Sequence, residues 1–527
     1  MMQLSQNQTK RLTAVHGWGG VVLGLLLYVV VATGTVAVFG QEIAKWSAGA
    51  SSSRGIDHPI DAIVRDLATK LPRFYLAETS IWENEAGELV AFFHSHVPKP
   101  ETGENADFGT LFRIDPVSAV VLDRHEGFIW ERPDTWETSA LRHFLVELHV
   151  RLHLPDPWGL LATGILALLL MATALSGLLM HRHLIRDLFV AERSRARLVS
   201  ARDRHLLASS WSLPFAVVLA FTGSFFSFAS TVSLPILAQV AFGGDREAMM
   251  ETLYEPAAPA DDRPAVAADL DSILTRSTEA TGGPPVFVSI HGFGRADARV
   301  SVWHAAGGGR MGFAHAVFDG ADGRFLGVRP GIGISRSLGS DLNDLMWPLH
   351  VGDFAGLASK CLWGALGTTI CFVILSGLRL WVRRREIDPA WRRFGRAVTT
   401  VGYGLPVALI GSACAAFLSA TAGDPFFWTP VGFSVAALAG IALGAAVPEN
   451  DRLALAFRRT LAWSCLLLPI VRMAGGGRSW AEALANGDAE VIAIDLLALA
   501  TGGTLRLLVR RSPDRRDAAA QLPEPAE

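Results

Sequence analysis

The amino-acid sequence predicts a polytopic α-helical membrane protein with about eight transmembrane helices, two α+β domains outside the membrane, and a duplicated core. Three observations predict this fold class. Half of the 527 residues are hydrophobic and only 18% are charged, with a mean hydropathy of +0.32, which is more apolar than a soluble protein of this size. Runs of about 18 or more apolar residues recur along the chain, and clusters of arginine fill alternate gaps between them.

The apolar runs locate the spanning helices. We expect them near 15–39, 158–180, 207–229, 357–382, 397–421, 428–447, 457–473 and 490–508. The first run is longer than the core of a cleaved signal peptide, so we expect it to remain as a helix. All the basic clusters fall on one side, which the positive-inside rule makes cytoplasmic. Both termini are therefore expected in the cytoplasm.

Two long loops, 41–156 and 231–348, lie on the other side and repeat one order of elements. In the first loop, the amphipathic helix "DHPIDAIVRDLATKL" precedes two hairpins, which turn around Glu85-Ala86-Gly87 and Asp115-Pro116. In the second loop, the helix "AADLDSILTRSTEATG" precedes the strands "PPVFVSIHGFG", "ARVSVWHA" and "HAVFDGADGRFLGVRP". A helix followed by an antiparallel sheet thus occurs twice, which predicts two small α+β domains.

The helices around these loops are duplicated as well. "ELH" at 147–149 leads to "LSGL" at 175–178, and "PLH" at 348–350 leads to "LSGL" at 375–378. His16 precedes Thr33-Gly34 by the same spacing with which His205 precedes Thr222-Gly223. The core is therefore two copies of helix, outer domain and helix, related by an axis along the membrane normal.

These boundaries define nine units. They are a first span at 1–40, an outer domain at 41–156, a second span at 157–183, an Arg-rich cytoplasmic loop at 184–206, a third span at 207–230, an outer domain at 231–348, a fourth span at 349–385, a C-terminal four-helix bundle at 397–508 and a cytoplasmic tail at 509–527. The C-terminal bundle has no counterpart in the duplication and contains no histidine.

The duplication sorts the histidines into two pairs. His16 and His205 are equivalent and lie at the cytoplasmic mouth, whereas His149 and His350 are equivalent and lie at the outer mouth. Two-fold symmetry brings equivalent residues face to face, and two facing imidazoles between helices suit axial ligation of haem iron. We therefore expect two haems in series, one bound by each pair.

Glycines near these helices would leave room for a flat macrocycle, although glycines in membrane helices usually serve helix packing. They are Gly17, Gly19, Gly20, Gly24, Gly164, Gly177, Gly223, Gly364 and Gly367.

Other histidines compete for these roles. A histidine at a membrane interface is often only a rim residue. At the inner mouth, His181 and His183 are the alternatives, and only one of them can face the core. At the outer mouth, His153 lies four residues after His149 and could share a metal ion with it, but Pro155 follows closely.

Polar residues elsewhere have simpler interpretations. His94 and His96 share one face of a predicted strand, and His304 and His315 could do so across a hairpin. Such histidines are either polar surface or contacts to a substrate. Asp495, in the last span, requires a partner or a water-filled crevice.

Four segments of the chain resemble the helices of PepSY-associated transmembrane proteins. They are "KRLTAVHGWGGVVLGLLLYVVVATGTV", "ELHVRLHLPDPWGLLATGILALLLMATALSGLLMH", "RDRHLLASSWSLPFAVVLAFTGSFFSF" and "PLHVGDFAGLASKCLWGALGTTICFVILSGLRLWVRRR". The resemblance covers about 1–385, and its most specific part is the LHxGxFxG pattern at Leu349–Gly356.

The resemblance implies PepSY-like outer domains and two haem b groups on His16, His149, His205 and His350. It also implies a place in the bacterial inner membrane and delivery of electrons to ferric siderophores in the periplasm. The C-terminal bundle departs from the family pattern.

The leading interpretation is therefore a di-haem reductase in iron uptake. A membrane quinol or a cytoplasmic donor would supply electrons, and a ferric siderophore or another small ferric chelate would accept them. No GxGxxG follows a predicted strand, so no nicotinamide or flavin motif is evident, and the formal net charge of −3 gives no reason to expect nucleic acid. Two alternatives stay open: a siderophore or small-molecule transporter, although the core helices lack midplane charges, and a non-enzymatic sensor or accessory protein.

Overall fold

The computed structural model describes residues 5–49, 55–101, 103, 105–180, 197–254, 259–305, 312–421 and 423–510. His181 and His183, the alternative ligands at the inner mouth, lie outside these residues.

Within the described residues, eight helices are long and apolar enough to cross a membrane. They are α1 Gln6–Ala37, α5 Trp158–Met180, α7 Arg197–Phe228, α12 Gly356–Arg383, α13 Pro389–Ser419, α14 Pro425–Ala446, α15 Asn450–Ala474 and α17 Ala489–Arg510. Each overlaps one predicted span, so the polytopic fold class is confirmed.

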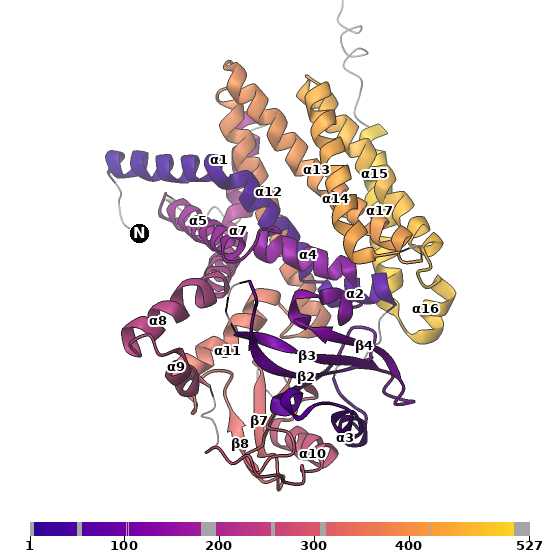
Figure 1. Ribbon diagram of the computed structural model, residues 1–527. Helices are drawn as coiled ribbons and strands as arrows, with labels where there is room; N and C mark the ends of the chain where they lie inside the picture. Colours follow the sequence, from indigo (N-terminus) through magenta and orange to yellow (C-terminus); the bar gives the residue numbers. More distant parts are fainter. Residues whose placement is uncertain are drawn as a thin grey trace, which may run out of the picture.

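The four helices of the duplicated core form a closed ring. Helix α1 packs against α5 and α12, and α7 packs against the same two helices. The interior of the ring is apolar, with Leu27, Leu166, Phe215 and Ile370 among its buried side chains. The C-terminal helices pack beside this ring, where α13 contacts both α12 and α1 (Figure 1).

The two outer segments build one antiparallel sheet in the order β4-β3-β2-β1-β5-β6-β7-β8. The first segment supplies β1 Glu78–Glu83, β2 Leu89–Pro98, β3 Asn105–Ile114 and β4 Val121–Gly127, and the second supplies β5 Pro285–His291, β6 Arg299–His304, β7 Ala314–Asp319 and β8 Phe325–Arg329. Both predicted hairpins of the first segment are confirmed. Strands β1 and β5 also pair, with Ile81 opposite Val288, so the two predicted α+β domains share one continuous sheet.

Helices α3 Asp61–Thr69 and α10 Leu270–Thr281 cover the same face of this sheet. They lie at the end of the molecule farthest from the spanning helices (Figure 1). Each helix caps the other: Asp61 Oδ1 accepts from the Leu270 amide at 2.9 Å, and Asp271 Oδ1 accepts from the Ile60 amide at 2.7 Å. The exchange of caps follows the two-fold relation of the duplicated segments.

The alternation of side chains along the strands corrects two expectations. His304 pairs with Ala314 and His315 with Trp303, so His304 and His315 project from opposite faces, and the prediction that they share a face is wrong. His94 does share a face with His96, but it is buried, with only 2% of its surface exposed.

Short helices connect the sheet to the spans. They are α2 Gly40–Ala48, α4 Ala140–Arg151, α8 Leu234–Ala241, α9 Arg246–Leu253 and α11 Leu338–Val351. A further short helix, α16 Trp480–Asn486, lies between the spans α15 and α17. His149 belongs to α4 and His350 to α11, and each of these helices is separated from the following span by a turn. Left-handed backbone at Leu152 and Gly352 ends the two helices. The sequence analysis placed both histidines at the outer mouth but did not predict these turns.

Candidate functional site

The outer histidine pair is brought together by α4 and α11. The ring centroids of His149 and His350 lie 6.0 Å apart, and their planes are inclined by 27°. Two imidazoles that share one metal ion, each nitrogen ~2 Å from it, have ring centroids roughly 6 Å apart. The spacing of this pair therefore suits a metal held between the two rings.

Hydrogen bonds fix the orientation of both outer rings. His149 Nδ1–H donates to the carbonyl of Val30 at 2.9 Å, since a carbonyl can only accept. His350 Nδ1 lies 2.9 Å from Thr222 Oγ1, and the hydroxyl proton of Thr222 is already donated to Val218. His350 Nδ1–H is therefore the donor here too. Both histidines thus keep the lone pair of Nε2 free for a ligand, as in metal sites where a second group holds the far nitrogen.

A glycine of α1 makes room for the His149 ring, and a glycine of α7 lies in contact with the His350 ring. A Cβ on Gly34 would lie 2.5 Å from His149 Cε1, and a Cβ on Gly223 would lie 3.5 Å from His350 Cε1. The Thr33-Gly34 and Thr222-Gly223 dipeptides, whose equal spacing from His16 and His205 indicated the duplication, therefore lie beside the outer histidines.

The inner pair repeats this arrangement on the "LSGL" segments. His16 Nδ1–H donates to the carbonyl of Thr173 at 3.0 Å and lies 3.2 Å from Ser176 Oγ. His205 Nδ1 lies 2.9 Å from Ser376 Oγ, whose proton is donated to Val373.

The inner glycines have the same function as the outer ones. A Cβ on Gly177 would lie 3.4 Å from His16 Cε1, and one on Gly377 would lie 3.2 Å from His205 Cε1. Each "LSGL" segment therefore supplies a serine that orients a histidine and a glycine that admits its ring.

All four histidines share one hydrogen-bonding arrangement. Each is half-buried, and each is held through Nδ1 by a residue on one helix of the ring. None of the four Nε2 atoms has a hydrogen-bond partner within the described part of the chain. His16 and Val30, the residue that holds His149, are 14 positions apart on α1, so the two pairs are about 20 Å apart along the helix. These residues fit two metal-centred groups in series, although haem ligation stays a prediction.

The alternative ligand at the outer mouth points elsewhere. His153 has left-handed backbone with φ of 53°, and its Nε2 lies 3.1 Å from the carbonyl of Phe144, on which its ring stacks. This geometry does not favour a metal shared by His149 and His153.

Most of the glycines named above pack against side chains. A Cβ on any of six of them would lie within 3.2 Å of a side chain other than histidine, whereas Gly20 has nothing within 4 Å. The six are Gly17, Gly19, Gly24, Gly164, Gly364 and Gly367. Helix packing, the second interpretation, therefore explains these six, whereas Gly177 and Gly223 contact histidine rings.

A polar cluster lies on the sheet face opposite α3 and α10. His96 Nδ1 lies 3.4 Å from Glu78, and its Nε2 lies 3.2 Å from Asp107. His291 of the second segment lies 3.6 Å from Glu78. Burial would raise the pKa of Glu78, but the hydrogen bond from His291 and the charge of the nearby histidines hold that pKa below its usual value. Burial lowers the pKa of His94 in the same cluster.

The sequence analysis missed Glu78, Asp107 and His291 as members of this cluster. Their proximity depends on the pairing of β1 with β2 and β5, and of β2 with β3. Alternation along a strand tells which residues share a face, but the pairing of β1 with β5 joins residues more than 200 positions apart in the chain.

Among the described residues, one further group could hold a metal ion: Asp57, His58 and Glu83. His58 Nδ1 lies 3.1 Å from Glu83, and the hydrogen bond to Glu83 raises the pKa of His58. An ion pair accounts for this group without a metal.

Two comparisons with known proteins bear on the site. A family model described as the PepSY-associated TM region matches residues 13–384, which include all four histidines. A protein of Pseudomonas aeruginosa described as uncharacterized is 28% identical over 256 residues. That alignment covers 46% of this chain and 64% of the relative, which is less than two thirds of the relative's length.

Proposed function

This chain belongs to the PepSY-associated transmembrane family, and from that premise we propose that it is a di-haem reductase of the bacterial inner membrane. In this proposal it passes electrons from a quinol or a cytoplasmic donor to a ferric siderophore, or another small ferric chelate, on the periplasmic side.

The observation that supports the proposal is that four histidines share the same hydrogen-bonding arrangement. Each Nδ1 is held by a carbonyl or hydroxyl on one of the four core helices, and each Nε2 keeps a free lone pair within the described residues. His149 and His350 would hold the outer haem, and His16 and His205 the inner one. Haem, when bound, supplies reversible one-electron chemistry.

The orientation follows from charge. Arg383 ends α12, and Arg384 and Arg385 follow in the turn before α13, at the end of the bundle away from the sheet (Figure 1). The positive-inside rule assigns that end to the cytoplasm, so the sheet lies in the periplasm. A membrane potential that is negative inside then favours outward electron transfer by about 2.3 kcal/mol per 100 mV for a full crossing.

The sheet face with His96, Glu78 and Asp107 is the proposed acceptor region. It lies on the side of the sheet opposite α3 and α10, and it offers both donors and carboxylates to a polar chelate. Reduction of ferric iron weakens its binding by hard oxygen ligands, so release would follow electron transfer.

Haem content of variants of the full chain tests this proposal. The purified protein should show a low-spin haem spectrum with two haems per chain by pyridine haemochrome assay. His149→Ala or His350→Ala should remove one haem, and His16→Ala or His205→Ala should remove the other. His153→Ala is the matched control and should keep both.

A protein without haem, or variants with unchanged haem content, would overturn the proposal and favour a transporter or a sensor. Reoxidation of the reduced protein by a ferric siderophore, followed by absorbance, then tests the acceptor. If reoxidation is no faster than with the iron-free siderophore, the assignment of the acceptor is wrong.

A further inference from the structure

A basic pocket lies at the end of the bundle that is farthest from the sheet. Its volume is about 630 Å³, and it is formed where α12 ends, α13 begins and the turn between α14 and α15 passes. Its charged lining residues are Arg392, Arg393, Arg396 and Glu386. None of these four lies near the histidine pairs in the chain, and the proposed electron transfer does not use them.

The three arginines of the pocket differ from other arginines at this end. Arg385 lies over the ring of Trp381 at 3.7 Å, Arg458 lies over Tyr403 at 5.6 Å, and Arg506 lies over Trp463 at 4.3 Å. Arg452 pairs with Glu449.

By contrast, the guanidinium groups of Arg392, Arg393 and Arg396 have no ion-pair or hydrogen-bond partner within the described ranges. Three free guanidinium groups therefore face one carboxylate around a single pocket, which favours an anion.

Backbone adds to this preference. The pocket is lined by the first two turns of α13 and by Asn450, the first residue of α15. At α13 this end is already capped, because Pro389 has no N–H and the Ala390 amide donates to Asp388. The amino end of α15 has no side-chain cap, and the partial positive charge and unpaired amides of such a helix end favour phosphate.

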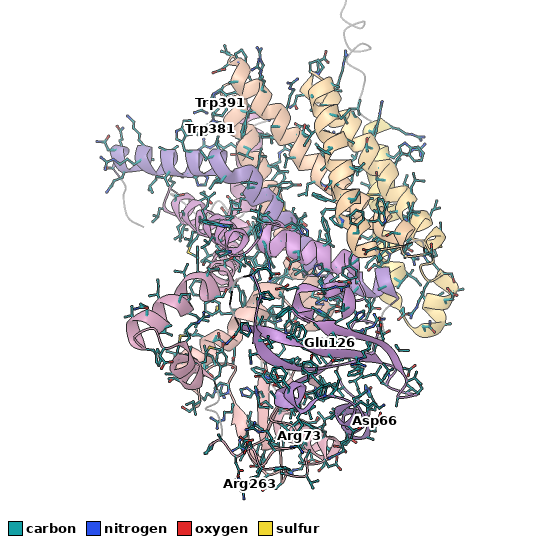
Figure 2. All side chains as sticks on the ribbon, viewed as in Figure 1. Asp66, Arg73, Glu126, Arg263, Trp381 and Trp391 are labelled. Atoms are coloured by element: carbon teal, nitrogen blue, oxygen red, sulfur yellow. The ribbon has the colours of Figure 1, made fainter. Side chains whose placement is uncertain are left out.

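The position of the pocket identifies the source of the phosphate. Trp381 and Trp391, whose ring centroids lie 5.9 Å apart, mark this end of the bundle (Figure 2), as aromatic residues mark the interface of a membrane. Val382, Pro389 and Pro448 give the pocket an apolar side, and the neighbouring Ile387 is 96% exposed. Basic pockets between spanning helices on the cytoplasmic side suit lipid headgroups. We propose that this pocket binds the phosphate of an anionic phospholipid in the inner leaflet.

Lipid binding to the full-length protein tests the proposal. Delipidated protein in detergent would be titrated with phosphatidylglycerol, diphosphatidylglycerol or phosphatidylcholine, and bound lipid counted by native mass spectrometry. We expect one saturable site that binds the anionic lipids at least ten-fold more tightly than phosphatidylcholine. The variant Arg392→Gln/Arg393→Gln/Arg396→Gln should lose this preference.

Two further variants separate the pocket from general surface charge and from misfolding. Arg11→Gln/Arg459→Gln/Arg510→Gln removes the same number of exposed arginines outside the pocket and should keep the site. Glu386→Gln removes the opposing carboxylate and should tighten binding, a gain that a damaged fold cannot produce.

Equal loss in both triple variants, or no gain in Glu386→Gln, would overturn the proposal. So would competition by inorganic phosphate at the concentrations at which the lipid binds, because the site would then belong to a free anion.

Discussion

At the scale of single residues, the site consists of histidines and the small residues that orient them. The sequence predicted His16, His149, His205 and His350 from their spacing. It did not predict that Thr222, Ser176 and Ser376 orient the rings. Each of these contacts joins two helices, and the sequence does not tell which faces of the two helices pack together. The repeated Thr-Gly and Ser-Gly dipeptides were the only signal available.

The two Thr-Gly positions allow a matched test at this scale. A Cβ on Gly34 would lie 2.5 Å from the His149 ring, whereas on Gly223 it would lie 3.5 Å from the His350 ring, an ordinary contact. We expect Gly34→Ala to displace the His149 ring and so to lower the content of outer haem. Overpacking at this position should also reduce the free energy of unfolding by roughly 1–3 kcal/mol. Gly223→Ala should change neither. Equal effects of the two variants, measured by haem content and by thermal unfolding, would contradict this orientation of the rings.

A second residue-scale prediction concerns pH. His315 is buried on the sheet and stacks on Trp303, and among the described residues its Nδ1 has no hydrogen-bond partner. Burial and the charge of Arg329 lower its pKa from 6.5 to about 4. A lowered pKa means that the folded state prefers neutral histidine, so this stabilisation is complete above pH 6.5 and is lost as the pH falls to about 4. It amounts to roughly 3 kcal/mol at most.

Hydrogen exchange of β7 in the full-length protein would measure this effect. Protection of β7, corrected for intrinsic exchange rates, should fall between pH 6.5 and 4, and His315→Phe should make that fall shallower. Some dependence should remain, since burial also lowers the pKa of His304 on the neighbouring strand. An unchanged pH profile in the variant would show that His315 does not carry the effect.

At the scale of elements, periodicity predicted the spans and the hairpins but not how the elements join. Long apolar runs and strand alternation are local signals, and all eight spans and both hairpins of the first segment were found from them. The pairing of β1 with β5 and the turns after α4 and α11 were missed. The pairing of β1 with β5 joins residues that are far apart in the chain. The turn after α4 depends on left-handed backbone at Leu152, and leucine does not indicate that conformation in a sequence.

The exchanged caps of α3 and α10 give a prediction at this scale. Asp271 accepts from the amides of Ile60 and Asp61, so Asp271→Ala should destabilise α3 in the other segment by about 1 kcal/mol. Asp269 accepts from amides of its own helix, so Asp269→Ala should affect α10 first. Hydrogen exchange of α3 and α10 in each variant measures which helix loses protection. If Asp271→Ala leaves α3 as protected as before, Asp271 does not cap the helix of the other segment.

At the scale of the whole molecule, a buried charge network joins the C-terminal bundle to the duplicated core. Asp495 of α17 accepts from Arg472 of α15 at 2.7 Å, and both side chains have no exposed surface. Trp46 of α2 and Trp480 each donate to Asp495 at 2.8 Å. The sequence analysis expected a partner for Asp495, and the bundle supplies it. The participation of Trp46 could not be expected, because α2 and α17 are joined only by the packing of the bundle on the core.

This network predicts that the bundle and the core unfold together. Arg472→Met leaves the Asp495 carboxylate buried without a cation, which should cost about 3–5 kcal/mol, whereas Arg472→Met/Asp495→Asn removes the orphaned charge and should recover part of the loss. Lys45→Gln is the control at the same interface, because it breaks only the partly exposed pair with Glu490 at 3.4 Å and should cost less than about 1 kcal/mol. Thermal unfolding of the full chain in detergent, followed by tryptophan fluorescence, measures all three variants. If Arg472→Met unfolds at the temperature of Lys45→Gln, the network does not hold the bundle to the core, and the C-terminal helices are an independent unit.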